Sequence, residues 1–284
     1  MSESSIARKF LDDAARRGYA TAPVKTTRMP PGIPYIVLNE AAERFSYYGM
    51  TSILTVFMAS SLLLDGAGHP APMAQPDAKA AFHLFVSAVY FTPFLGAVLS
   101  DAFLGKYRTV FWLSIVYCLG HASLSMNSTR LGLGIGLALI ALGSGGIKPC
   151  VSSNVGDQFG ASNEHLMTRV FGWFYLAINI GAFFSQLWIP SLLANPKLGP
   201  PVAFGVPGIL MLLATLAFWS GRKKFVHIPP SGGGLLRDAV SKEGRQTIGR
   251  LAILYIFFAV FWSLYYQTQS EWILQAARMD RHWL

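Results

Sequence analysis

Residues 203–219 read AFGVPGILMLLATLAFW, and residues 251–264 read LAILYIFFAVFWSL. As helices, both stretches are apolar around their whole circumference, so neither has the polar stripe that a helix on a soluble protein presents to water. The rest of the chain agrees, because 52% of the 284 residues are hydrophobic and only 13% are charged, which is about half the usual charged fraction. The two stretches therefore predict helices that lie in a lipid bilayer, and an all-α membrane protein.

Seven stretches are long and apolar enough to cross the hydrocarbon core of a bilayer, which takes about 20 helical residues. The expected spans are residues 34–62, 79–100, 108–126, 132–154, 168–191, 202–220 and 248–270. They divide the chain into a tail (1–33), a six-helix transmembrane bundle (34–220), a linker (221–247) and a last segment with the seventh helix (248–284). The Gly-rich, basic linker predicts a boundary between two bundles. An odd seventh helix, followed closely by Arg281 to Leu284, then suggests a truncated second bundle.

Lys and Arg are distributed unequally between the two sides of these spans. With the N-terminus inside, the tail, the linker and the inner loops hold 16 of the 23 basic residues and the outer loops hold 5, while Arg44 and Lys148 lie within the membrane. Short cytoplasmic loops are enriched in basic residues. The distribution therefore predicts a multi-pass protein of the cell membrane, inner or plasma, with a cytoplasmic N-terminus.

The tail and the net charge add two expectations. Ile6, Phe10, Leu11 and Ala14 share one face of a possible short helix with basic residues opposite, so the tail either rests on the lipid surface or is flexible. The net charge of +9 does not predict nucleic acid binding, because the basic residues lie between apolar segments and form no stripe interleaved with aromatic residues. We therefore expect the chain to contact the lipid bilayer and not to bind nucleic acid.

The first span carries a stripe of polar residues. Glu40, Glu43, Arg44, Tyr47 and Tyr48 follow the i, i+3, i+4, i+7, i+8 pattern, so they share one face of a helix. A charged side chain at the centre of a bilayer costs roughly 2.5–3.5 kcal/mol on insertion scales, so these residues must face a cavity or each other. The guanidinium can pair with either carboxylate, and burial favours protonation of the one left over. The stripe thus indicates a proton-binding site, with an inert ion-pair cluster as the alternative.

A further charge lies in the fourth span, within residues 143–154 (GSGGIKPCVSSN). Lys148 precedes Pro149, which removes a backbone donor and bends the helix, while the glycines let a neighbouring helix or a substrate approach closely. A lone ammonium group on such a helix predicts an anion site. The segment is not a phosphate-binding loop, because no strand precedes it and the lysine is followed by Pro rather than Ser or Thr.

The short loop after the second span, within residues 96–108 (GAVLSDAFLGKYR), combines acidic and basic side chains at helix ends. Asp101, Lys106 and Arg108 are expected to hold neighbouring helices together on the cytoplasmic side and to release them during a conformational cycle. The alternative is that each is an ordinary charged residue at a helix end.

Several segments, in order, resemble a known family. Residues 40–49 (EAAERFSYYG) resemble the ExxERFxYYG motif of the proton-dependent oligopeptide transporter (POT) family, a branch of the major facilitator superfamily. Residues 96–120 resemble the family's loop signature, and residues 143–159 resemble its fourth-helix segment. Residues 171–183 and 261–272 resemble its fifth-helix and seventh-helix segments. The resemblance runs from about residue 33 to the end of the chain.

This resemblance implies the N-terminal six-helix bundle of a twelve-helix transporter, plus the first helix of the second bundle. It also implies symport of di- and tripeptides with protons, driven by the proton gradient without enzyme activity, a cofactor or a metal. Proton coupling would then involve Glu40, Glu43 and Arg44. Substrate contacts would involve Tyr47, Tyr48, Lys148, Asn179 and Gln186, the last two on the same face of the fifth span as Tyr175.

Two positions depart from the family pattern. Thr51 stands where many peptide-transporting members carry a second Arg that helps to bind the peptide C-terminus, and it lies on the face of the charged stripe. Tyr266 stands where members have an acid that takes part in proton coupling and pairs with the lysine of helix four, and Glu271 lies five residues further on. Lys148 is therefore expected to lack its usual partner. These departures keep open a member that transports another small anionic or zwitterionic solute, and the missing second bundle keeps open a truncated, non-transporting membrane protein.

Overall fold

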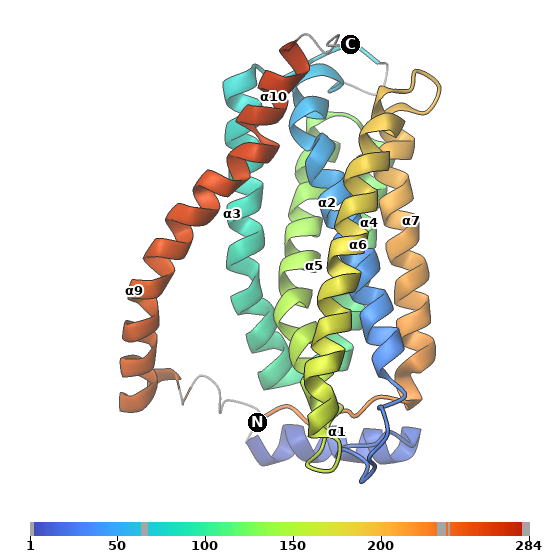
Figure 1. Cartoon of the computed structure of the whole chain (residues 1–284), viewed down its shortest axis with the longest axis vertical. Coiled ribbons are helices and arrows are strands. Elements are labelled where there is room, and N and C mark those ends of the chain that lie inside the picture. Colours follow the sequence, from blue (N-terminus) through green and yellow to red (C-terminus); the bar gives the residue numbers. More distant parts are fainter. Residues whose placement is uncertain (1–2, 64–67, 232–236, 238, 280–284) are drawn as a thin grey trace.

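The structure, a computed structural model, describes residues 3–63, 68–231, 237 and 239–279. Within these residues it is built of helices without strands, apart from isolated bridges. The α-helices in chain order are α1 (Glu3–Arg17), α2 (Ile33–Ser60), α3 (Gln75–Leu99), α4 (Lys106–Met126), α5 (Arg130–Asp157), α6 (Met167–Ala194), α7 (Gly199–Ser220), α9 (Lys242–Tyr265) and α10 (Glu271–Arg278). A short π-helical segment, Ser100–Leu104, follows α3. Figure 1 shows α2 to α7 running side by side, with α1 lying across one end of them and α9 standing apart.

The helices α2 to α7 match the first six expected spans to within about one helical turn. Six helical segments of the described chain are long and apolar enough to cross a membrane: Gln75–Leu104, Lys106–Met126, Arg130–Asp157, Glu164–Ala194, Gly199–Lys223 and Lys242–Arg278. The first expected span is not among them. Its helix, α2, has 28 residues and is therefore long enough to cross, but it contains the charged stripe.

The core of the bundle lies around α2, most of whose residues are buried. This helix packs on α6 and α7, while α5 packs on α3 and α4. Glycine permits the closest approaches. A Cβ atom at Gly96 would lie 2.4 Å from the carbonyl oxygen of Gly146, and one at Gly181 would lie 2.6 Å from the carbonyl oxygen of Ala41. Among the glycines of the fourth expected span, Gly145 lies against Thr92 of α3 and Gly143 lies against Tyr117 of α4, so these glycines serve the approach of two neighbouring helices.

The tail is ordered at the end of the bundle where α1 lies, called here the α1 end. Phe10 and Ala14 of α1 are buried, so part of the apolar face that the sequence predicted contacts protein rather than lipid. The Tyr19 ring stacks on the ring of His227 at a centroid distance of 4.2 Å, and the His227 N–H donates to the Ala20 carbonyl at 2.7 Å. The expectation of a flexible tail is therefore wrong for the described residues, because the start of the linker pairs with the tail.

The seventh expected span, residues 248–270, differs from the structure at both ends. Helix α9 begins at Lys242, where the Ser241 side chain accepts a hydrogen bond from the Gly244 N–H. It ends at Tyr265, and a 3-10 segment, Tyr266–Gln269, separates it from α10.

Tertiary hydrogen bonds explain this break. The Thr55 hydroxyl of α2 donates to the Gln269 carbonyl at 2.9 Å, and the Ser270 hydroxyl lies 3.1 Å from Nε2 of His83. Lys79 of α3 forms an ion pair with Glu271 of α10. The seventh helix is thus tied to the bundle at the end opposite α1. Arg281 to Leu284, which suggested a truncation, lie outside the described residues, as does part of the linker at 232–236 and 238.

Candidate functional site

The polar stripe of α2 forms a buried ion-pair cluster, called here the α2 triad: Glu40, Glu43 and Arg44. The Arg44 Nε atom lies 2.9 Å from Oε1 of Glu40, and its Nη2 atom lies 2.5 Å from Oε2 of Glu43. The side chains of Arg44, Glu40 and Glu43 are 9%, 6% and 0% exposed. The sequence allowed Arg44 to pair with either carboxylate, and in the structure it contacts both. One positive charge thus bridges two negative charges inside the bundle.

Helix α5 brings a fourth side chain to the triad. The Ser144 hydroxyl donates to Oε1 of Glu43 at 2.5 Å. Ser144 lies one helical turn before Lys148 and so shares its face of α5. The Lys148 charge is close enough to interact with the charges of Glu40, Glu43 and Arg44. Two helices therefore assemble one site from residues about a hundred positions apart.

Lys148 lies against two aromatic rings. Its Nζ atom lies 4.6 Å from the ring centroid of Tyr47 and 5.3 Å from that of Tyr90. The Tyr90 hydroxyl lies 3.2 Å from the hydroxyl of Tyr266. Among the residues that the structure describes, Lys148 forms no ion pair with a carboxylate. Tyr266 thus brings a phenol rather than a carboxylate into this group.

A cavity of about 710 Å³ lies between α3 and α9. Its lining combines aromatic rings with a few polar groups, including His83, Ser87, Tyr90, Trp262, Tyr266 and Gln267. Tyr90 lines the cavity, and its ring also contacts the Lys148 ammonium group. A mostly apolar cavity with a few convergent polar groups is the usual form of a small-molecule site. The α2 triad, Lys148 and this cavity therefore form one connected region.

The predicted substrate residues of α6 lie apart from this region. Asn179 and Gln186 are exposed, and their side-chain amides donate to carbonyls of their own helix, those of Tyr175 at 2.7 Å and Ala182 at 3.3 Å. Helix α6 packs on α2 through its opposite face, at Gly181. The structure thus leaves these two amides at an open face of the bundle and does not join them to the triad.

Tyr48, Thr51 and Glu271, which the sequence analysis also considered, lie in three different surroundings. Tyr48 is half-buried, and its ring packs edge-on against Tyr47 at 5.6 Å. Thr51 is fully buried, and its hydroxyl donates to the Tyr48 carbonyl at 3.2 Å. Thr51 therefore faces its own helix rather than a cavity. Glu271 pairs with Lys79 at the far end of the bundle, and so does not pair with Lys148.

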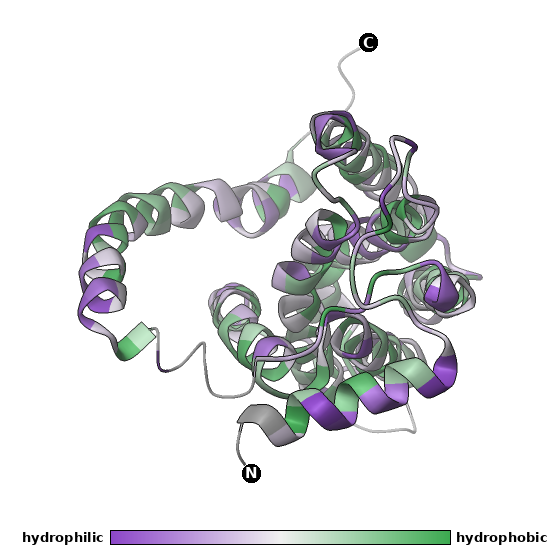
Figure 2. Ribbon diagram, turned by 90° about the horizontal axis from the view of Figure 1, so that it is seen from below, coloured by the Kyte–Doolittle hydropathy of each residue, from purple (hydrophilic) through white to green (hydrophobic). Residues whose placement is uncertain are grey.

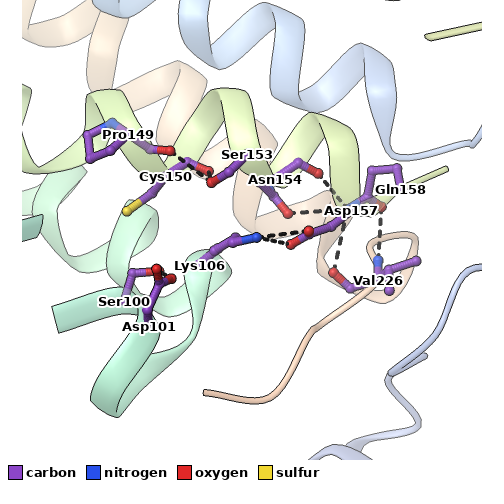
Figure 3. Close-up of polar contacts among 10 residues, drawn as sticks. All are labelled: Ser100, Asp101, Lys106, Pro149, Cys150, Ser153, Asn154, Asp157, Gln158 and Val226. Carbon is purple, nitrogen blue, oxygen red and sulfur yellow. Dashed lines mark hydrogen bonds and ion pairs between the residues drawn. The ribbon is translucent and has the colours of Figure 1, made fainter. Parts of the chain in front are cut away.

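The three predicted gating residues lie at the α1 end and have separate partners. Lys106 Nζ contacts both carboxylate oxygens of Asp157, at 2.7 and 2.8 Å, which joins α4 to α5 (Figure 3). Arg108 forms an ion pair with Asp13 of α1. The Asp101 carbonyl accepts hydrogen bonds from the backbone N–H and the hydroxyl of Ser231. Lys106 and Arg108 thus connect helices through carboxylates that the sequence did not identify, whereas Asp101 contacts the linker through its backbone carbonyl.

Asp13 is the most connected acid at this end. The hydrogen bond from Arg17, at 3.0 Å, and the charges of Arg17 and Arg108 hold the pKa of Asp13 below its ordinary value. Asp13 therefore stays ionised between two guanidinium groups, and it fixes α1 to the start of α4.

The sequence left several members of the site unidentified. Ser144 could have been found from its spacing, since it lies four residues before Lys148 on the same helical face. Tyr90 and Asp157 carry no such signal, because their roles depend on which helices are neighbours. Within the described chain, no three His, Cys, Asp or Glu side chains are grouped so that they could hold a metal ion.

Comparisons with known proteins agree on one family. Residues 107–242 match the family model described as PTR2, POT family. Solute carrier family 15 member 2 of Rattus norvegicus is 38% identical over 299 residues, which cover 88% of this chain and 40% of that protein. The chain thus spans about 40% of the length of the curated relatives that it matches.

Solved structures give the same result. The crystal structure of the POT family transporter PepTSo is 45% identical, with a TM-score of 0.66 over 85% of this chain and 48% of that one. A proton dependent oligopeptide (POT) family transporter is 39% identical, with a TM-score of 0.75 over 88% of this chain and 66% of that one. These similarities confirm the expected fold, an all-α membrane protein of the major facilitator type. The chain belongs to the POT family of transporters.

Proposed function

We propose that this protein couples the entry of protons to the uptake of di- and tripeptides by alternating access. The observation that carries the proposal is the α2 triad, in which one buried guanidinium bridges two buried carboxylates. In this proposal the proton gradient drives transport, the substrate site lies in the region of Lys148, and the protein sits in the cell membrane with its N-terminus in the cytoplasm. The names of similar proteins, such as peptide transporter family 1 of Drosophila melanogaster, support the substrate class.

The charge count of the triad supports proton binding. Two carboxylates share one guanidinium, so the triad by itself carries one net negative charge, and the uptake of one proton makes it neutral. In the proposal the Lys148 charge offsets the ionised triad, and protonation of the triad frees Lys148 to pair with a substrate carboxylate. The Ser144 hydroxyl stabilises ionised Glu43 by donating to it. When Glu43 is protonated, the same hydroxyl can rotate and accept, because a serine oxygen has both capacities. Both protonation states of Glu43 therefore find a partner, as a reversible proton carrier requires.

Lys148 supports recognition of a carboxylate. Its ammonium group lies against the rings of Tyr47 and Tyr90 and forms no ion pair with an acid of the described chain. A substrate carboxylate would supply the missing negative charge and would also lie near the α2 triad. Substrate and proton are thereby coupled, since each changes the net charge that the other meets. In the proposal, Tyr47, whose ring lies against Lys148, and the neighbouring Tyr48 contact the substrate, and Asn179 and Gln186 contact it from the open face of α6.

The pairs at the α1 end support a gate. Lys106 and Asp157 join α4 to α5 through partly exposed side chains, and Arg108 joins α4 to α1 through Asp13. Such pairs can break and reform at modest cost because water solvates the separated charges. In the proposal they close the cytoplasmic side during one half of the cycle, with Asp101 holding the linker at Ser231.

A second candidate is transport of another small anionic or zwitterionic solute. Thr51 is buried against its own helix and so offers no cation to a peptide C-terminus. Tyr266 brings a neutral phenol where an acid would balance Lys148. Both observations favour a substrate with fewer contacts than a peptide.

The test is uptake by the protein in liposomes. Under an inward proton gradient we expect a labelled dipeptide to accumulate, and we expect accumulation to stop when a protonophore collapses the gradient. Lys148→Ala should weaken dipeptide binding at least tenfold, about 1.4 kcal/mol, whereas Lys197→Ala at an exposed loop should not. Failure to accumulate dipeptide, together with accumulation of another small anion, would favour the second candidate. An unchanged affinity in Lys148→Ala would count against the carboxylate site.

A further inference from the structure

A second cavity lies at the α1 end, away from the α2 triad. It has a volume of about 700 Å³ and is bounded by α1, by the π-helical segment with the first two turns of α4, and by the end of α7 with Arg222. Figure 2 shows α1 lying across this end of the bundle, with hydrophilic and hydrophobic residues alternating along it. None of the residues assigned to proton or peptide binding lines it.

The cavity is strongly basic. Five basic side chains line it against one carboxylate, that of Asp13: Lys9, Arg16, Arg17, Arg108 and Arg222. Asp13 already forms ion pairs with both Arg17 and Arg108. Lys9, Arg16 and Arg222 form no ion pair with a carboxylate of the described residues. The cavity therefore has positive charge that the protein itself does not neutralise, which attracts an anion.

The walls of the cavity include exposed aromatic rings. Phe103, Trp112 and Trp219 line it and are 56%, 57% and 45% exposed. They stand at the ends of helices that are apolar enough to cross a membrane. Tryptophan is enriched at this level of membrane proteins, where hydrocarbon meets the headgroups. A ligand of this cavity thus meets both positive charge and apolar rings.

Arg222 contacts one of these aromatic rings. Its guanidinium carbon lies 3.8 Å from the ring centroid of Trp219, and its Nη1 donates to the Trp219 carbonyl at 3.0 Å. Arg108 is placed in a similar way, since its guanidinium lies 5.0 Å from the ring centroid of Phe10. Two guanidinium groups are therefore fixed by ring contacts, and planar guanidinium groups suit the oxygens of a phosphate.

We propose that this cavity binds the headgroup of an anionic glycerophospholipid from the bilayer leaflet that surrounds the α1 end. The phosphate lies among Arg16, Arg108 and Arg222, and the acyl chains run along Trp112 and Trp219. A phospholipid offers a phosphate to the basic side chains and acyl chains to the aromatic rings, whereas free phosphate can contact only the basic side chains. The bound lipid would bridge α1, α4 and α7.

Native mass spectrometry of the full chain tests this proposal. The protein in detergent is mixed with equal amounts of phosphatidylglycerol and phosphatidylcholine, and the bound lipids are counted. We expect a preference for phosphatidylglycerol that falls about fivefold for each basic side chain removed, the usual contribution of one such charge near anionic lipid. Arg16→Gln removes an exposed side chain and leaves the fold intact, and Arg16→Gln combined with Arg222→Gln should lower the preference further.

The matched control is Arg130→Gln combined with Lys197→Gln, which removes two exposed charges outside the cavity. This control should keep the preference. Equal losses in both double variants, or equal binding of the two lipids by the unmodified protein, would overturn the proposal. Displacement of phosphatidylglycerol by inorganic phosphate alone would identify a free anion as the ligand and would also overturn it.

Discussion

The α2 triad and the Lys106–Asp157 pair both join a basic side chain to carboxylates, but they differ in how far water reaches them. The triad side chains are 0–9% exposed, whereas Lys106 and Asp157 are 22% and 18% exposed. Buried charges need each other, because the loss of one partner leaves a charge that water cannot reach. Partly exposed charges can separate into water at little cost. The difference suggests that the triad must exchange a proton to change its state, while the pair at the α1 end can simply open.

The largest effect is expected from Arg44→Gln. This change leaves Glu40 and Glu43 buried without their cation, so the free energy of unfolding should fall by about 3–5 kcal/mol, as for other broken buried pairs. Chemical unfolding in detergent measures the change. Glu43→Gln in the same background should recover part of the loss, since it removes one of the two stranded charges. A loss below about 1 kcal/mol would mean that water reaches the triad.

A much smaller effect is expected from the exposed pair. Lys106→Ala should lower the free energy of unfolding by about 0.2–1 kcal/mol, the range for pairs in contact with water. Asp157→Asn should have a similar effect, and the double variant should show a coupling energy in that range that shrinks at high salt. If the coupling matched that of the triad, the distinction between the two regions would fail.

The smallest effect is expected at His227, whose ring stacks on Tyr19 at the α1 end. Burial lowers the pKa of His227 below its ordinary value of 6.5, against the opposing hydrogen bond to the Arg222 carbonyl. The stability that the neutral ring contributes is therefore present above about pH 6.5 and is lost as the pH falls through the lower folded pKa. His227→Phe keeps a ring for stacking and should flatten this dependence of the melting temperature on pH. An unchanged pH profile would assign the dependence to other groups.

The sequence predicted more of the bundle than of its contacts. Apolar length alone placed α3 to α7 correctly, and the helical spacing of Glu40, Glu43 and Arg44 predicted one buried face. The break after Tyr265 could not be predicted, because the apolar pattern continues through it and the hydrogen bonds that hold the broken segment are made with Thr55 and His83 on other helices.

The partners of the charged residues were missed for a related reason. Asp13 and Asp157 lie far from Arg108 and Lys106 in sequence, so only the packing of α1 and α5 beside α4 brings them together. Likewise, the amphipathic face of α1 was visible in the sequence, but whether it would meet lipid or protein was not. Patterns within one helix are thus readable from sequence, and pairings between helices require the structure.

The central claim is that the α2 triad carries the coupled proton, and Glu43→Gln in liposomes tests it most directly. Two measurements are made on the same preparation: dipeptide accumulation under an inward proton gradient, and exchange of labelled for unlabelled dipeptide at equal pH on both sides. We predict that accumulation is lost while exchange is retained, because a side chain that cannot ionise can still permit substrate movement but cannot release a proton. Accumulation at the unmodified rate in Glu43→Gln would contradict the account.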